Sequence, residues 1–500
     1  MSLDPASLQI LISRLGGIAD EMGAVLRRAA YSPNIKERAD CSAAVFTADG
    51  ELLAQAEHIP VHLGSMPASV AAVIDAVAAD PSGSVAPGDE FVVNDPFAGG
   101  THLNDITVVA PCFVGPALVG WVANRAHHAD VGGIAPGSMP ATSTSIWQEG
   151  VIVPPVRLTG EVLAVLLANV RTPELRRGDL AAQSAANRIA EERLAELRFP
   201  LVEAFEAVIA YAERQAREAI VRLPDGRYEA EGEVETDIDL PIRVAVTIAG
   251  DRVEIDFDGT SPAAPGNVNA PLAVTRAACT FAVKVALGAD VPVNDGLFRA
   301  VEIRAPEGCL VNARHPSAVV AGNVETSQRI ADTVLLALGQ AADVPAQGQG
   351  TMNNLVIGSR RWTYYETLGG GQGASSRGDG PSGVHVGMSN TLNTPIEALE
   401  LDAPLRVERY ELLDGSGGEG RHRGGNGLVR AVRVLEPATL SLLTDRRRHA
   451  PQGREGGGPG RPGRNLVNGE ELAPKATREL AAGDVVTVET PGGGGWGVSR

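Results

Sequence analysis

The sequence predicts an α+β fold of helices and mainly antiparallel β-sheets. Residues 4–30 and 173–222 place apolar side chains at the spacing of amphipathic helices. Residues 243–248 and 253–257 instead alternate apolar and polar side chains, as half-buried strands do. From about residue 351 onward the chain is rich in glycine and in short β-prone runs, which favours a β-rich C-terminal part.

The composition is that of an ordinary globular protein, because 44% of the 500 residues are hydrophobic and 21% are charged. The net charge of −18 argues against nucleic acid and anionic membrane as partners. The four cysteines form no CxxC pair, so neither a disulfide framework nor a zinc ribbon is indicated and a reducing cytoplasm fits. We expect no signal peptide, because the N-terminal residues carry no early positive charge and their apolar side chains are spaced rather than continuous. We expect no membrane helix, because no apolar run reaches the length needed to span a bilayer.

We expect a single unit over residues 1–500 with three sub-regions. These are an N-terminal region 1–224 that contains the helical segment 173–222, a mixed α/β region 225–350, and a β-rich, glycine-rich region 351–500. The turn Leu223-Pro224-Asp225-Gly226 marks the first boundary.

The first helix has strong start signals, with Asp4 as its N-cap and Pro5 at the first helical position. Next, Asp49-Gly50 between the runs 41–46 and 51–54 is typical of a two-residue hairpin turn. We then expect a helix over 68–79 and a strand over 89–93. These elements lead into the central stretch of the chain.

Two histidines, His58 and His62, lie between that hairpin and the second helix. Pro60 separates them, which excludes a helical pair that presents both rings on one face. We therefore expect a loop here that could line a pocket.

After the second predicted strand, we expect residues 130–155 to form a long loop, the kind that often serves as a lid or binding loop, with Gln148 and Glu149 as its polar candidates. Helices are expected over 274–287 and 323–338, on either side of a strand near 301–304. Asn323 is a plausible N-cap of the second helix, with Glu325 in its first turn.

The central stretch, residues 94–130, contains three of the chain's nine histidines. The β-prone runs 107–109 and 118–122 flank Gly115-Pro116 and predict an antiparallel hairpin. His102 and Asp105 lie just before the first run, and His127 lies just after the second. Antiparallel pairing would bring these three side chains together at the open end of the hairpin.

Two imidazoles and a carboxylate suit Mn, Fe or Zn and leave positions open for water or substrate. The same donors make the facial triad of non-haem iron oxygenases, whose mark would be iron-dependent oxygen uptake. The alternative interpretation is that these are unrelated polar residues at strand ends.

Several segments resemble the hydantoinase B/oxoprolinase family, the B-type subunits of ATP-dependent hydantoinases, 5-oxoprolinases and lactamases. They span nearly the whole chain and include SPNIKERADCSAAVF, LLAQAEHIPVHLGSMP, NDPFAGGTHLNDITVVAP, ANRAHHADVGGIAPGSMP, QEGVIVPPVRL, NVRTPELRRGDLAAQ, LNTPIEALE, GSGGEGRHRGGNG and TPGGGGWG. One departure is GVHVGMSNTLNTP, where Val386 and Gly387 follow His385 in a segment that is usually richer in histidine and threonine.

This resemblance implies a divalent metal held by His102, Asp105 and His127, with Asp40 as a further ligand or close neighbour. It also implies that water attacks a cyclic amide that an ATPase partner has phosphorylated. His128 or Asp130 could shuttle the proton, or could instead orient the ligand ring.

The expected partner is a hydantoinase A-type ATPase subunit in a cytoplasmic hetero-oligomer, and ATP is expected on that subunit. In this chain the glycine-rich runs contain no GxxxxGK[ST] motif. Two other functions stay open: a subunit of an ATP-dependent ketone carboxylase, which carries a similar chain, and a non-catalytic scaffold for the ATPase.

Overall fold

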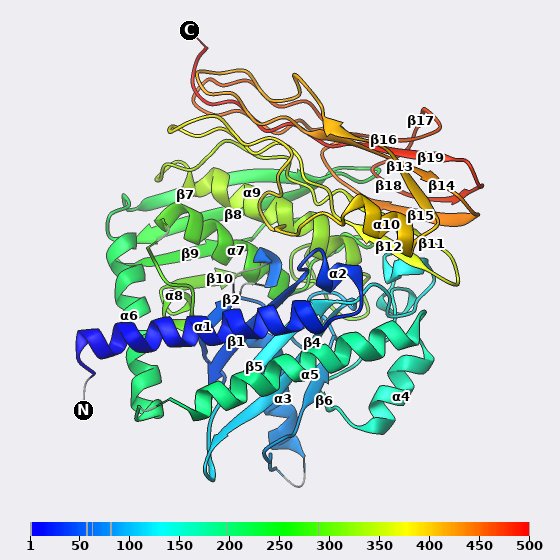
Figure 1. The fold of residues 1–500 in the computed structure, drawn as a ribbon. Helices are drawn as coiled ribbons and strands as arrows, with labels where there is room; N and C mark the ends of the chain where they lie inside the picture. The colour runs from blue at the N-terminus through cyan, green and yellow to red at the C-terminus, as the bar shows by residue number, and fades with distance from the viewer. Residues whose placement is uncertain are drawn as a thin grey trace.

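The computed structural model describes residues 3–56, 59–62, 64–80, 83–197, 199–288 and 290–499, so His58 lies outside the described part. Within those residues the strands form four sheets. Figure 1 shows the C-terminal strands as an upper layer, α7 and α9 below them, and the N-terminal sheet at the bottom behind α1 and α5. The predicted α+β class is therefore confirmed.

The N-terminal sheet has the order β2-β1-β5-β4-β3-β6, and all its pairs are antiparallel. The helices and strands of this N-terminal region are α1 (Pro5–Ala29), α2 (Pro33–Lys36), β1 (Cys41–Thr47), β2 (Leu52–Ala56), η1 (Pro60–His62), α3 (Met66–Ala79), β3 (Phe91–Val93), β4 (Asp105–Val114), β5 (Ala117–His127), η2 (Pro136–Ser138), η3 (Ile146–Gln148), β6 (Val156–Arg157), α4 (Gly160–Ala168), α5 (Pro173–Ala195) and α6 (Leu201–Ile220).

Successive side chains of β1 point to opposite faces of this sheet, and different helices cover the two faces. Cys41, Ala43 and Val45 pack with α1, α5 and α6 in one apolar cluster. Ala44 and Phe46 point the other way and pack against α3. Two apolar layers therefore enclose the sheet, and its β4–β5 hairpin is buried except at the turn.

The N-terminal helix begins as predicted. The Asp4 carboxylate accepts hydrogen bonds from the backbone N–H groups of Ala6 and Ser7, at 3.0 and 3.1 Å. The β1–β2 hairpin around Gly50 and the helix α3 are also confirmed.

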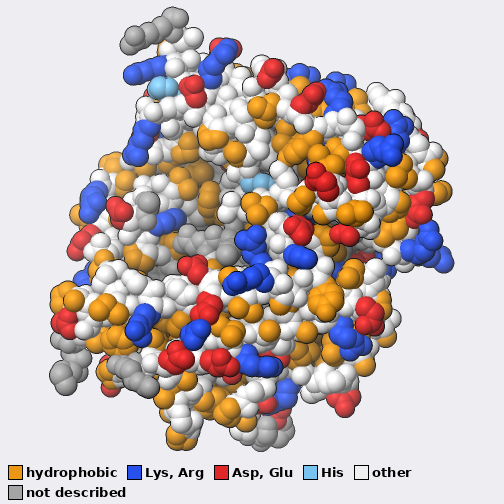
Figure 2. Space-filling model, viewed as in Figure 1, with side chains coloured by type: hydrophobic (Ala, Val, Ile, Leu, Met, Phe, Trp, Pro, Cys, Tyr) orange, Lys and Arg blue, Asp and Glu red, His pale blue; other side chains and the backbone are white. Residues whose placement is uncertain are grey.

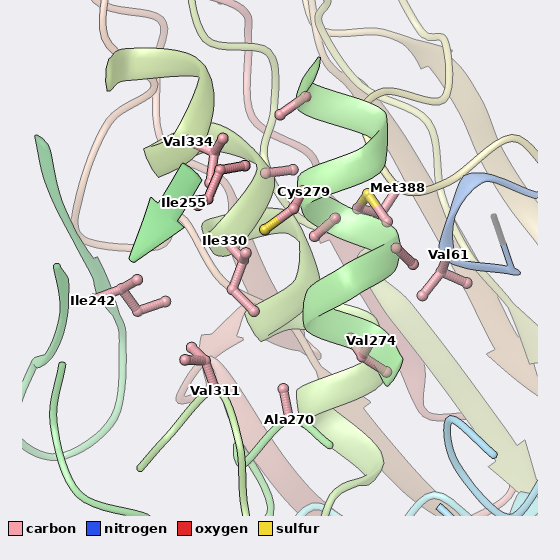
Figure 3. Close-up of a cluster of buried hydrophobic side chains, with 14 of the residues drawn as sticks. Val61, Ile242, Ile255, Ala270, Val274, Cys279, Val311, Ile330, Val334 and Met388 are labelled. Carbon is pink, nitrogen blue, oxygen red and sulfur yellow. The ribbon is translucent and has the colours of Figure 1, made fainter. Parts of the chain in front are cut away.

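The middle region is a four-stranded sheet, β10-β9-β8-β7, covered by α7 and α9. Its elements are β7 (Gly226–Val234), β8 (Leu240–Ala249), β9 (Arg252–Asp256), α7 (Leu272–Leu287), α8 (Asp295–Phe298), β10 (Val301–Arg304), η4 (Gly322–Thr326) and α9 (Ser327–Leu338). Figure 3 shows Ile330 and Val334, which are side chains of α9, in the same apolar cluster as Ile255 of the sheet. β10 runs parallel to β9 after a helical crossover, which is compatible with the prediction of mainly antiparallel sheets.

The C-terminal region pairs a four-stranded sheet with a five-stranded one across a shared apolar layer. Its elements are β11 (Asn354–Gly358), β12 (Thr363–Glu366), α10 (Ile396–Asp402), β13 (Leu405–Leu412), β14 (Leu428–Val434), β15 (Ala438–Leu443), β16 (Arg464–Val467), β17 (Glu470–Glu471), β18 (Lys475–Leu480) and β19 (Val485–Glu489).

Its glycine-rich runs pack backbone against backbone. Gly493 donates its N–H to the Gly425 carbonyl, and Gly494 donates to Gln347. A Cβ on Gly493 would lie 2.0 Å from the Gln372 carbonyl oxygen, so only glycine fits there. We call the mutually bonded segments 371–374, 417–425, 452–458 and 492–495 the glycine bundle.

Two local predictions are wrong in detail. Asn323 is not an N-cap, because it lies inside the π-helical turn η4 that precedes α9. Asp105 and His127 do not flank the hairpin strands but form their ends, and both strands are longer than the β-prone runs indicated.

All four cysteines are buried free thiols. Figure 2 shows acidic and basic side chains interspersed on the face it views, with no large area of one sign. Of the described residues, one helical stretch, Pro60–Ala79, is long and apolar enough to cross a membrane by length and composition alone. Met66, Val70 and Val73 of that stretch pack on the N-terminal sheet, as in a core helix.

Candidate metal centre

The β4–β5 hairpin places its candidate ligands by register. Gly115 and Pro116 make the two-residue turn, and Gly115 has a φ of 59°. From there the ladder runs back to a direct pair between Asp105 and His127. His102 reaches the same point because the preceding turn folds back, with the Asp105 N–H donating to the His102 carbonyl at 3.0 Å.

One donor atom from each of His102, Asp105 and His127 lies within 4.8 Å of the others. All three residues are at most 3% exposed. His102 Nε2, Asp105 Oδ1 and His127 Nε2 are buried without a hydrogen-bond partner among the described residues. Buried polar atoms normally have hydrogen-bond partners. Three potential metal-ligand atoms in one cluster without such partners therefore fit a metal ion that would bind them.

The other oxygen of Asp105 is fully engaged. Oδ2 accepts from Thr101 Oγ1 at 2.6 Å and lies 3.0 Å from His102 Nδ1 and 3.3 Å from His62 Nε2. Burial alone would raise the pKa of Asp105, but the neighbouring imidazoles outweigh it and hold that pKa well below its ordinary value. Oδ2 therefore anchors the carboxylate and leaves Oδ1 for a ligand.

His62 completes this anchor. Its Nδ1 lies 3.0 Å from Ser42 Oγ on β1, and its ring is 1% exposed. The 3₁₀ turn η1, which begins at Pro60, directs the ring inward. The sequence predicted only that His62 lies in a loop that could line a pocket. In the structure His62 contacts the Asp105 carboxylate directly.

His127 is held by stacking on Tyr365 of β12, with ring centroids 4.5 Å apart and planes 10° apart. The Tyr365 hydroxyl donates to Asn354 Oδ1 at 2.9 Å, and Asn354 Nδ2 donates to Glu325 Oε1 at 2.9 Å. Burial lowers the pKa of His127, while Asp105 and Asp40 oppose that shift. The ring is therefore kept neutral and able to act as a ligand.

The π-helical turn η4 supplies two of these supports. Asn323 Nδ2 lies 3.0 Å from His102 Nδ1, and Glu325 holds Asn354. Turns of this kind recur at functional sites because they redirect side chains that a regular helix would point elsewhere. Tyr365 and Asn323 had no local signal in the sequence, since more than 200 residues separate each from the histidine it contacts.

Asp40 lies beside the cluster, outside the three residues whose donor atoms lie within 4.8 Å of one another. Its backbone carbonyl accepts the His127 N–H at 3.0 Å, and its carboxylate lies 3.7 Å from Arg38 Nη2. Arg38 is fully buried, donates to the Tyr365 carbonyl and stacks over the Tyr365 ring. The predicted role of Asp40 as a fourth ligand stays a prediction.

His128 and Asp130 point away from the cluster. His128 Nε2 lies 2.9 Å from Gln183 Oε1 on α5, and burial lowers its pKa to about 4. Asp130 accepts from the N–H groups of Gly132 and Gly137 and pairs with Arg171 at 2.9 Å. Asp130 thus holds the loop after β5, whereas His128 Nδ1 is buried without a hydrogen-bond partner among the described residues. The predicted catalytic role of these two residues stays a prediction.

The candidates from the long loop also have structural partners. Gln148 Oε1 accepts from the Thr144 N–H at 2.7 Å. Glu149 is buried, accepts from the N–H groups of Val319 and Val320, and has a pKa raised to about 7 by burial. His385 lies between Ser389 and Thr391, within hydrogen-bond distance of both hydroxyls.

The fold and these residues define an α+β protein with a buried His/Asp cluster that could hold a divalent metal. Comparison with known proteins then places the chain: the family profile described as hydantoinase B/oxoprolinase matches residues 4–499. The chain belongs to the hydantoinase B/oxoprolinase family.

Two relatives illustrate the range of this family. The B-type chain of a putative D-/L-hydantoinase from a Pseudomonas species is 30% identical, over 99% of this chain and 90% of its own length. The 5-oxoprolinase 1 of Arabidopsis thaliana is 39% identical over 99% of this chain. This chain spans only 42% of the length of that larger protein.

Two solved structures share the fold. The ATP-dependent caprolactamase from Pseudomonas jessenii superposes with a TM-score of 0.90 at 27% identity, over 100% of this chain and 92% of its own. An acetone carboxylase chain superposes with a TM-score of 0.88 at 20% identity, over 99% of this chain and 76% of its own. At 20% identity, the similarity to the acetone carboxylase chain shows a shared fold and nothing more.

Proposed function

We propose that this chain is the metal-dependent hydrolytic subunit of an ATP-coupled cyclic-amide hydrolase of the 5-oxoprolinase, hydantoinase or lactamase type. The observation that carries the proposal is the convergence of His102, Asp105 and His127, each with one buried, unpaired donor atom. Relatives named as a hydantoinase and a 5-oxoprolinase, and a caprolactamase of the same fold, support this reaction class.

His102, Asp105 and His127 would hold the metal, and Mn, Zn and Fe all accept these donors. Such an ion supplies Lewis acidity and makes water acidic enough to act as a nucleophile near neutral pH. The chain keeps the donor atoms oriented through Thr101 and His62 on Asp105 and through Tyr365 on His127. His128 or Asp130 would transfer the proton, or would instead orient the ring of the ligand His127.

An unstrained amide resists water, because resonance protects its carbonyl and nitrogen is a poor leaving group. We infer that a hydantoinase A-type ATPase subunit, which would bind the ATP, transfers a phosphoryl group to the amide oxygen. One water then adds to the carbon, the C–N bond breaks and releases the amine, and a second water hydrolyses the acyl phosphate. The four buried thiols favour a cytoplasmic location for this hetero-oligomer.

The ketone carboxylase is the second candidate, since an acetone carboxylase has the same fold. The near full-length match to a hydantoinase chain favours the hydrolase. Bicarbonate-dependent ATP consumption with acetone would identify a carboxylase, whereas ring opening without bicarbonate would identify a hydrolase. A scaffold would leave turnover unchanged in His102→Ala.

Metal content by mass spectrometry is the direct test, with wild type beside His102→Ala, Asp105→Ala and Asp40→Asn. We expect about one divalent ion per wild-type chain and its loss in the first two variants. His422→Ala changes a partly exposed histidine paired with Asp379 and serves as the control. No ion in reconstituted wild type, or full retention in both ligand variants, would refute the metal centre. The Asp40→Asn protein reports whether that carboxylate is a fourth ligand.

A further inference from the structure

The segment 385–392 contacts Arg38, a fully buried residue just before β1. The Leu392 N–H donates to the Arg38 carbonyl at 2.8 Å. Gln328 of α9 also holds this segment, because its side-chain amide donates one hydrogen bond to the segment's backbone and accepts another from it. The segment therefore connects α9 with the start of β1.

Polar side chains link Arg38 to this segment in an unbroken series, which we call the polar chain. Arg38 Nη2 lies 2.7 Å from Thr367 Oγ1, which lies 2.6 Å from Thr391 Oγ1. Thr391 Oγ1 lies 3.2 Å from His385 Nε2, and His385 Nδ1 lies 2.7 Å from Ser389 Oγ. The three hydroxyl residues are buried and His385 is half-buried. Each link is short enough for a hydrogen bond, so the hydrogens must be shared consistently along the series.

Arg38 sets the direction at one end of the polar chain. Its guanidinium has only N–H donors, so Thr367 Oγ1 accepts there. The hydrogen of the Thr367 hydroxyl then has one acceptor within reach among the described residues, Thr391 Oγ1. If Thr391 donated to Thr367 instead, that hydrogen would be buried without an acceptor, which is unfavourable. Thr367 therefore donates to Thr391.

The same reasoning assigns the hydrogen on His385. The Thr391 hydroxyl, which already accepts from Thr367, donates to His385 Nε2. A neutral imidazole has one N–H, which is then on Nδ1 and donates to Ser389 Oγ. Burial and the charge of Arg38 lower the pKa of His385 to about 3, so the ring stays neutral.

The distance between Ser389 Oγ and His385 Nδ1 is also that of a nucleophile and its base. A base needs a free lone pair on the nitrogen that faces the hydroxyl. In the polar chain that nitrogen already carries the hydrogen, so His385 cannot take the proton of Ser389. The assignment therefore favours a structural use of this pair over covalent catalysis.

The other end of the polar chain reaches the candidate metal centre. Arg38 Nη1 donates to the Tyr365 carbonyl at 2.9 Å, and the guanidinium carbon lies 4.7 Å from the centroid of the Tyr365 ring. That ring stacks on His127. Arg38 Nη2, which donates to Thr367, also lies 3.7 Å from the Asp40 carboxylate. A shift of Arg38 would therefore disturb the support of His127.

We propose that His385, with its hydrogen on Nδ1, is a positioning residue of the candidate metal centre. Through the two threonines of the polar chain it fixes the Arg38 guanidinium, and Arg38 fixes the Tyr365 ring against His127. The direction of the hydrogen bonds follows from the polar chain alone. The effect on metal binding rests on the proposed function, because it requires that His127 is a ligand.

NMR of the metal-free chain, isotope-labelled at its histidine ring nitrogens, tests the direction of the polar chain without metal, ATP or partner. The signals of His385 are those that His385→Gln removes. If that variant does not fold, Ser389→Ala identifies them, because it changes the neighbour of one histidine ring. We expect hydrogen on Nδ1 and none on Nε2. Hydrogen on Nε2, or on both nitrogens near neutral pH, would overturn the proposal.

Zinc affinity, measured by competition with a fluorescent chelator, tests the link to His127. Thr391→Val keeps the side-chain shape but removes the hydroxyl, and should weaken zinc binding about three- to tenfold, less than the loss of a group that touches a ligand. Thr391→Ser keeps the hydroxyl and should bind zinc as wild type does. Equal affinities of these two variants would overturn the proposal. If Thr391→Val does not fold, Thr367→Val and Thr367→Ser provide the same comparison one link earlier.

Three further results separate this proposal from its alternatives. Ser389 should not react with a fluorophosphonate, and covalent labelling of Ser389 would overturn the assignment of the hydrogen. If wild type binds no zinc, the metal centre is refuted together with the role of His385 there, while the NMR spectrum still decides the direction of the polar chain. His422→Ala, which changes a partly exposed histidine paired with Asp379, should leave both the zinc affinity and the His385 signals unchanged.

Discussion

Asp105 and His127 are direct partners across the β4–β5 ladder, one at the start of its strand and the other at the end. The Oδ1 atom of Asp105 and the Nδ1 atom of His127 lie 3.6 Å apart. A shift of one residue in this register would move one of the two side chains to the opposite face of the sheet. The cluster therefore depends on hairpin pairing as much as on residue type.

Removal of the His62 ring should weaken metal binding without abolishing it. In His62→Ala, Asp105 Oδ2 loses the imidazole that lies 3.3 Å away, and loss of such supporting contacts typically lowers metal affinity about 10–100-fold. Competition with a fluorescent zinc chelator measures this loss. Ser42→Ala, which only frees His62 Nδ1, should cost less. An affinity unchanged in His62→Ala would show that Thr101 and His102 alone fix the carboxylate.

Substitutions of Tyr365 separate the stacked ring from its hydroxyl. Tyr365→Phe keeps the stack on His127 and loses one hydrogen bond to Asn354, worth about 1 kcal/mol. Tyr365→Leu removes the aromatic face and should lower metal affinity further than the Phe variant does. The same chelator competition ranks the two variants, and equal affinities would mean that stacking does not position His127.

Much of this site is readable from the sequence because its candidate ligands are close together in the chain. His102, Asp105 and His127 lie within one hairpin, and Gly115-Pro116 marks its turn. The class of the fold follows in the same way from the periodicity of α1, α5 and β8.

The supports of the site could not be predicted, because they depend on packing between distant regions. Asn323 has the residue type of an N-cap, yet it lies inside the π-helical turn η4, where a Cβ on the neighbouring Gly322 would lie 1.8 Å from the Asn269 carbonyl oxygen. Tyr365 gives no sequence signal of its contact with His127. The parallel pairing of β10 likewise follows from the course of α7 and α8, which the alternation of a single strand does not encode.

Stability should depend on pH through Glu191, on α5. Burial and the Glu90 carboxylate raise its pKa from 4.5 to about 7. Because the folded-state pKa is the higher one, the contribution of Glu191 to stability is complete below about pH 4.5 and is lost as the pH rises to 7. Thermal unfolding of Glu191→Gln should show a higher Tm than wild type at pH 8 and a smaller difference at pH 4.5. Glu192→Gln, a change at the next, exposed position, should have the same Tm as wild type at both pH values.

Two glycine-to-alanine changes should shift stability in opposite directions. In Gly493→Ala the new methyl group would lie 2.0 Å from the Gln372 carbonyl oxygen, so we expect a loss of about 1–3 kcal/mol or more. In Gly17→Ala, within α1, nothing lies within 4 Å, so the better helix former should add about 0.5–1 kcal/mol. Denaturant unfolding measures both, and equal effects would contradict the close packing of the glycine bundle.

The glycine bundle also sets an order of events during synthesis. Residues 492–495 bond to backbone groups of residues that leave the ribosome much earlier, including Gln347, Gly425 and Gly458. Until that late segment emerges, the N–H and C=O groups that await it have no partner in the nascent chain. During that interval these glycine-rich segments present unpaired backbone groups that could pair with a neighbouring polypeptide, so we expect aggregation to compete with folding until the bundle is complete.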